Sequence, residues 1–234
     1  MHPINKIFTL YSLAVLIIII ERLLPYTRNV LQPYNFISVH QLIQTLIFIP
    51  ITVILLFFAM KIITNNFHAL KEKGNSLLVF LFVIGVYFYG AGEGWHEVAN
   101  FALHTHCNTH QSFNNICGGL FINSFYTGNL IFFIGGVFMN LSLLTLAKKL
   151  PTPSLTKNQI IILILNSIVY AFTWFAYAAF DTVSVGFLFS LLLTITSLGF
   201  LTVVRKKWKA YPFIIYSAIA YSLATIATCI VRFS

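Results

Sequence analysis

Runs of about 20 apolar residues recur along the whole of this 234-residue chain. Wound as an α-helix with a rise of about 1.5 Å per residue, such a run matches the ~30 Å hydrocarbon layer of a bilayer. Open irregular backbone is too costly in lipid, so a spanning segment is a helix or a strand of a closed barrel. Barrel strands need alternating polarity, which these unbroken runs lack. The runs therefore predict membrane-spanning helices.

Composition excludes a water-soluble fold. Hydrophobic residues make up 59% of the chain and charged residues 8%, whereas soluble domains carry roughly 25% charged residues. We expect a single all-α transmembrane domain over residues 1–234, a polytopic helical bundle with membrane lipids as partners. The expected location is a bacterial inner membrane or another plasma membrane.

Charged residues and Pro/Gly-marked breaks separate seven predicted spans. They lie near residues 7–24, 41–63, 77–103, 119–147, 159–180, 183–204 and 211–231. The first run is not followed by a small-residue cleavage site, so we interpret it as an uncleaved span rather than a signal peptide.

The basic residues predict the orientation. With the N-terminus in the cytoplasm and the C-terminus outside, eleven of the fourteen Lys and Arg residues fall on the cytoplasmic side, as the positive-inside rule requires. The eleven are Lys6, Lys61, Lys71, Lys73, Lys148, Lys149, Lys157, Arg205, Lys206, Lys207 and Lys209; the other three are Arg22, Arg28 and Arg232. The net charge of +9 therefore indicates topology, and we expect no nucleic-acid partner.

Two cysteines, Cys107 and Cys117, lie in the loop between the third and fourth spans, which this topology places outside. Disulfides persist in oxidising external compartments, so we expect these two residues to form one. The same loop holds His104, His106 and His110. Imidazoles with a thiol suit zinc or copper, but the alternative is an exposed polar loop closed by the disulfide.

Polar residues are densest at the outer end of the third span. In a helix at about 100° per residue, five of them fall within an arc of roughly 100° and share one face. They are Glu93, His96, Glu97, Asn100 and His104. The two carboxylates, one turn apart, repel each other unless a proton or cation lies between them.

This face predicts a candidate active site. Glu93 and His96 have the Glu-x-x-His spacing with which a helix presents two ligands in carboxylate-bridged metal proteins. We expect His96, Glu93 and His104 to bind a zinc, iron or copper ion, with Glu93 and Glu97 as catalytic groups and one of them free as general base. The alternative is that these side chains are solvated or only fix helix packing.

Asp181 is the one acidic residue after Glu97. It either completes the site on the third span or serves as a turn and helix-capping residue.

Three functions follow from these residues. The first is a metal-dependent membrane enzyme that acts on a lipid or other amphipathic substrate. The second is a proton- or cation-coupled transporter, because carboxylates and imidazoles carry protons through membranes. The third is a non-catalytic scaffold that binds another protein.

Overall fold

The computed structural model describes residues 2–33, 35–72, 74–108 and 115–234. Within these ranges every regular element is a helix, and the sole β contact is an isolated bridge between Val30 and Ser38. Seven of the helical segments are long and apolar enough to cross a membrane. The all-α prediction with seven long apolar helices is therefore confirmed.

The spans begin within about two residues of the predicted positions, except that the first and the fourth each begin about four residues earlier. The first is α1 (Pro3–Leu23), and the second is formed by α2 (Val39–Ile43), a π-helical turn η2 (Gln44–Phe48) and α3 (Ile49–Ile63). The third is α4 (Asn75–His106), and the fourth is formed by α5 (Asn115–Phe121), the π-helical η4 (Ile122–Gly128) and α6 (Asn129–Lys149). The last three are α7 (Lys157–Phe180), α8 (Val185–Val204) with η5 (Arg205–Ala210), and α9 (Pro212–Phe233). Short 3-10 turns lie at Pro25–Arg28 (η1) and His68–Lys71 (η3).

The π-helical turn η2 lies directly before Pro50. Proline has no N–H, and its ring clashes with the carbonyl group four residues earlier in a regular α-helix. A wider π turn at this point lets the chain continue as one helix. Gln44, the first residue of the turn, contacts Glu21 near the end of α1.

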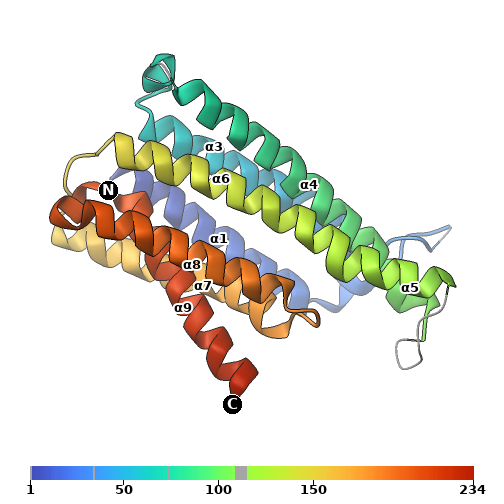
Figure 1. The fold of residues 1–234 in the computed structure, drawn as a ribbon. Coiled ribbons are helices and arrows are strands. Elements are labelled where there is room, and N and C mark those ends of the chain that lie inside the picture. Colours follow the sequence, from blue (N-terminus) through green and yellow to red (C-terminus); the bar gives the residue numbers. More distant parts are fainter. Residues whose placement is uncertain (1, 34, 73, 109–114) are drawn as a thin grey trace.

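Close packing of α4 against α6 depends on glycines. A Cβ atom placed on Gly92 would lie 2.2 Å from the backbone nitrogen of Phe132, and one on Gly135 would lie 2.2 Å from that of Tyr89. Both distances are far below van der Waals contact, so only glycine allows the two backbones to approach this closely. Figure 1 shows α4 and α6 running side by side along the bundle.

Helices α1 and α7 lie side by side and run in the same direction. The Asn5 side-chain nitrogen donates to the Gln159 carbonyl oxygen at 2.8 Å, and the Ser12 hydroxyl donates to Asn166 Oδ1 at 2.7 Å. The two contacts are seven residues apart on both helices, which fixes the register between them. That register places the last turns of α1 opposite the last turns of α7.

Most acidic residues lie at one end of the bundle and most basic residues at the other. We call the end at which α1, α4 and α7 finish the acidic end; it holds Glu21, Glu93, Glu97 and Asp181. The opposite end carries the lysines of the α6–α7 connection and the basic turn η5. Both Lys148 and Lys149 end α6 there.

Candidate functional site: a cavity at the acidic end

A cavity of about 200 Å³ lies among α1, α3, α4, α6 and α7. A single water needs only about 10–15 Å³ measured in the same way, so the cavity has room for a group of many atoms. Its wall is mostly apolar and aromatic, with a few polar groups, as in small-molecule sites generally. The polar side chains other than tyrosine are Arg22, Gln44, Thr52, Glu93, Asn140 and Thr173.

Glu93 and Arg22 are the charged side chains among the described residues that line this cavity. Glu93, on α4, is 2% exposed, and its Oε2 atom has no hydrogen-bond partner. Arg22, near the end of α1, is close enough to Glu93 to act on it electrostatically. The two groups form no salt bridge within 4.0 Å among the described residues, so the two side chains face the same cavity without pairing directly.

Three aromatic rings surround the Glu93 side of the cavity. The rings of Tyr89 and Phe132 are stacked with their centroids 4.4 Å apart, and the ring of Tyr177 lies 5.8 Å from that of Phe132. All three line the cavity; Tyr177 interacts with Glu93 through its hydroxyl group, and Tyr89 interacts with Glu93 electrostatically. A carboxyl group in a cavity that is also lined by aromatic rings is an environment that favours an organic cation.

The cavity opens on the side of the bundle between α1 and α7. Arg22 and Ile19 of α1, and Phe172 of α7, line it and are nevertheless exposed; Ile19 is 43% exposed and Phe172 is 58% exposed. A residue that both lines a cavity and is exposed lies at its mouth. The mouth is therefore lined by apolar side chains, with one guanidinium group at the acidic end.

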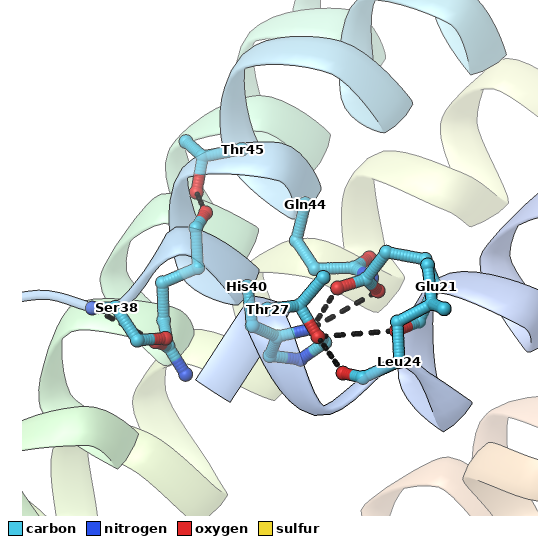
Figure 2. A network of polar contacts seen from close by, with 8 residues as sticks. Glu21, Leu24, Thr27, Ser38, His40, Gln44 and Thr45 are labelled. Carbon is cyan, nitrogen blue, oxygen red and sulfur yellow. Dashed lines mark hydrogen bonds and ion pairs between the residues drawn. The ribbon is translucent and has the colours of Figure 1, made fainter. Parts of the chain in front are cut away.

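A second polar group, which the sequence did not predict, joins the end of α1 to α2 and η2 (Figure 2). The Nδ1 atom of His40 contacts both carboxylate oxygens of Glu21, and Gln44 Nε2 donates to Glu21 Oε2 at 3.1 Å. Glu21 is only 5% exposed, so these contacts compensate the burial of its charge. The Thr27 hydroxyl caps the end of α1 by donating to the carbonyl oxygens of Glu21 and Leu24.

Gln44 belongs to both groups. It contacts Glu21 in the buried network and also lines the cavity. The network therefore fixes the wall of the cavity on the side of α1 and η2. The sequence signal for it was weak, because Glu21 lies on α1 whereas His40 and Gln44 lie one turn apart on the next span, and no pattern within either segment indicates the other. The adjacent charges of Glu21 and Arg22 at the end of an apolar run were the signal that could have indicated a site on α1.

The predicted catalytic residues are buried but have different surroundings. Glu97 is 4% exposed and, like Glu93, has an Oε2 atom without a hydrogen-bond partner. Only Glu93 lines the cavity. The two carboxylates are one helical turn apart on α4, as the sequence predicted.

His96 and Asn100 contact η4 and do not line the cavity. The Nδ1 atom of His96 lies 2.8 Å from the carbonyl oxygen of Ser124, and the Ser124 hydroxyl donates to Asn100 Oδ1 at 3.5 Å. Since a carbonyl oxygen can only accept, His96 donates through Nδ1 in this contact. The pair ties α4 to η4.

The predicted metal ligands are not gathered into one site. His104 and His106 are exposed at the end of α4, and His110 lies outside the described residues. His104 is two turns beyond His96, about 12 Å along the helix axis. Within the described part of the chain, no group of three or more His, Cys, Asp and Glu side chains is arranged to hold a metal ion.

The predicted disulfide is present: Cys107 and Cys117 are bonded, with their Cα atoms 5.8 Å apart. It joins the end of α4 to α5.

Asp181 caps a turn rather than lining the cavity. Its carboxylate oxygens accept from the backbone N–H groups of Val183 and Gly186 at 3.0 Å and 2.5 Å. Its own carbonyl oxygen accepts from Arg232. These contacts agree with the second of the two roles predicted for Asp181, that of a turn and helix-capping residue.

Comparison of the chain with protein-family models, with curated proteins and with solved structures finds no match. The class that the fold and the cavity define is therefore a bundle of seven potentially membrane-spanning helices with a charged, aromatic cavity that opens between two of them.

Proposed function

We propose that this chain is an integral membrane protein that binds an amphipathic molecule in the cavity at Glu93. The observation that supports the proposal most is the mouth between α1 and α7, whose exposed apolar residues continue into the cavity and end at a buried carboxylate. In a bilayer this mouth faces lipid. An amphipathic ligand would place its polar group near Glu93 and its chain between Ile19 and Phe172.

The proposal includes the orientation expected from the basic residues. The end formed by Lys148, Lys149 and η5 lies in the cytoplasm, and the acidic end lies outside. Helix α4, with 32 residues, is about 48 Å long and exceeds the ~30 Å hydrocarbon layer. Its last turns, with His104 and His106, then reach the external aqueous layer. The particular membrane, a bacterial inner membrane or another plasma membrane, stays a prediction.

We also propose that the same cavity could be the active site of an enzyme. Glu93 has a carboxylate oxygen without a partner, so it can accept a proton from a bound substrate as a general base. A zinc, iron or copper ion at Glu93 would need His96 to leave its contact with Ser124 and would need further ligands. Metal analysis of protein purified without chelators tests this directly: a stoichiometric metal that is lost in His96→Ala supports a metal enzyme, and its absence argues against one.

One observation favours a second candidate function, the movement of protons or cations. Glu93 and Glu97 are both buried, and each has an unpartnered oxygen, which is typical of groups that exchange protons within membranes. Proton flux into liposomes that is abolished by Glu93→Gln would favour this role. Equal flux in liposomes with and without the protein would contradict it.

Ligand binding is tested by filling the cavity. Gly136 lines the cavity, and a Cβ atom placed on it meets no atom within 4 Å. Gly136→Leu therefore adds a side chain that enters the cavity without displacing the backbone. Gly199→Leu is the matched control, since Gly199 is an exposed glycine of α8 with the same open surroundings.

The proposal predicts saturable binding of a radiolabelled C16 amphiphile to wild-type protein and to Gly199→Leu in maltoside micelles. Binding is lost in Gly136→Leu. Equal binding by all three proteins, or saturable binding by none, would contradict a ligand site in this cavity.

A further inference from the structure

We infer that the cavity selects a zwitterionic headgroup, with the ammonium group at Glu93 and the anionic group, a phosphate or carboxylate, at Arg22. The inference rests on the proposed function, because it specifies the ligand of the same cavity. It follows from the placement of two opposite, unpaired charges around one space.

The first step concerns the cation. The Glu93 carboxyl group is buried, has one oxygen without a hydrogen-bond partner and shares the cavity with Tyr89 and Tyr177, of which Tyr177 contacts it through the hydroxyl group. A buried carboxylate with a free oxygen is costly unless a cation or proton neutralises it. Aromatic rings that line the same cavity attract ammonium groups through cation–π interactions. An ammonium group satisfies both requirements together.

The second step concerns the anion. Arg22 lines the cavity at its exposed mouth and forms no hydrogen bond or ion pair with another described residue. A guanidinium group binds phosphate and carboxylate through two parallel N–H donors. Its place at the mouth puts the anionic group nearer the surface of the bundle than the ammonium group.

The third step concerns the distance between the charges. Arg22 and Glu93 interact electrostatically but are not within 4.0 Å of each other. If they formed a direct salt bridge, each would neutralise the other and a charged ligand would have to break that pair. Their separation instead leaves space for a ligand that carries both charges and contacts each residue with the opposite one.

The apolar mouth of the cavity indicates that the ligand also carries an alkyl chain. Ile19 and Phe172 continue the wall from Arg22 to the side of the bundle. An alkyl chain attached to the anionic group leaves the cavity between α1 and α7. A phosphocholine- or phosphoethanolamine-type lipid has this order of groups, with the chain, phosphate and ammonium in sequence. A free zwitterion has the same headgroup without the chain.

The test uses three amphiphiles that share one C16 chain and differ only in charge. They are hexadecylphosphocholine, which is zwitterionic, hexadecyl phosphate, which is anionic, and hexadecyltrimethylammonium, which is cationic. Phosphocholine without a chain serves as the fourth probe. Competition against radiolabelled hexadecylphosphocholine on full-length protein in maltoside micelles measures their affinities.

For the wild type we expect the zwitterion to bind about tenfold or more tightly than either singly charged amphiphile, since each charged contact contributes at least that factor. Glu93→Gln retains the shape of the side chain and removes the preference over hexadecyl phosphate. Arg22→Gln removes the preference over hexadecyltrimethylammonium. Each variant thus loses a different half of the selectivity, an outcome that a purely structural role would not produce.

Competition by phosphocholine alone at similar concentrations would identify a free zwitterion as the ligand, and its failure would identify a lipid headgroup. Equal affinity of the three C16 amphiphiles for wild-type protein would overturn the inference while leaving the binding proposal intact. No saturable binding of any C16 amphiphile would instead overturn the binding proposal itself. His106→Gln, at an exposed position away from the cavity, is expected to retain the wild-type order.

Discussion

The Nδ1 atom of His40 lies 2.9 Å from Glu21 Oε1 and 3.0 Å from Glu21 Oε2. This contact joins the end of α1 to α2 across a connection of fifteen residues that has little regular structure. Because Gln44 also binds Glu21 and lines the cavity, the pair supports the wall of the candidate site.

Replacing His40 tests how much this pair contributes to stability. His40→Ala leaves the buried Glu21 carboxylate with Gln44 as its recorded side-chain partner, and we expect the free energy of unfolding to fall by about 1–3 kcal/mol. Thermal unfolding in detergent micelles measures the change. His106→Ala, at an exposed position, should unfold as the wild type does. Equal unfolding temperatures for His40→Ala and the control would show that the Glu21–His40 contact does not stabilise the bundle.

Substitution of Gly92 tests the close approach of α4 and α6. In Gly92→Ala the new methyl group meets the Phe132 backbone at 2.2 Å, so the helices must move apart and we expect a loss of about 1–3 kcal/mol. Gly199→Ala adds the same methyl group in open space and should be neutral or stabilising by up to about 1 kcal/mol. The comparison of the two unfolding temperatures decides the matter, and a stabilised Gly92→Ala would contradict the packing described.

The seven helices could be predicted from the sequence because apolar length is a local property. Each span needs only its own residues to match the thickness of a bilayer, and charged residues mark its ends. Helix starts are less well defined by apolar length: the first and fourth segments begin at Pro3 and Asn115, about four residues before the predicted starts at 7 and 119, because polar residues at a helix end can lie outside the apolar layer.

The candidate site could be predicted only in part, because it depends on contacts between helices. The periodicity of α4 correctly placed Glu93 and Glu97 one turn apart, yet it could not show that only Glu93 faces a cavity. Arg22 and Tyr177 come from helices far away in the sequence, and no pattern within either segment indicates the partner. His104 shares the face of Glu93 in projection, but the two turns after His96 carry it to the exposed end of the helix.

Counting reactive thiols tests the disulfide. In denatured, unreduced protein a maleimide should modify one cysteine per chain, Cys229, because Cys107 and Cys117 are bonded. After reduction it should modify three, and mass spectrometry of the intact chain gives both numbers. Three modified cysteines before reduction would show that the pair is not oxidised in the purified protein.

Orientation is tested with single cysteines in a variant whose three native cysteines are replaced by serine. Asn29→Cys lies in the exposed connection at the acidic end, and Ser154→Cys lies in the exposed connection at the basic end. An impermeant maleimide applied to intact cells should modify the cysteine at position 29 and leave that at position 154 unmodified until the cells are lysed. The reverse pattern would invert the proposed topology, and modification of both would argue against a closed membrane barrier between them.

The central claim is that the cavity between α1 and α7 receives an amphipathic molecule, and photocrosslinking tests it most directly. A hexadecylphosphocholine that carries a diazirine in its chain is irradiated with the protein in maltoside micelles, and the modified residues are mapped by mass spectrometry. We predict modification concentrated at Ile18, Ile19 and Phe172, competed by excess unlabelled compound and lost in Gly136→Leu. Modification spread evenly over the outward faces of all seven helices, unchanged by competitor and by Gly136→Leu, would contradict the claim.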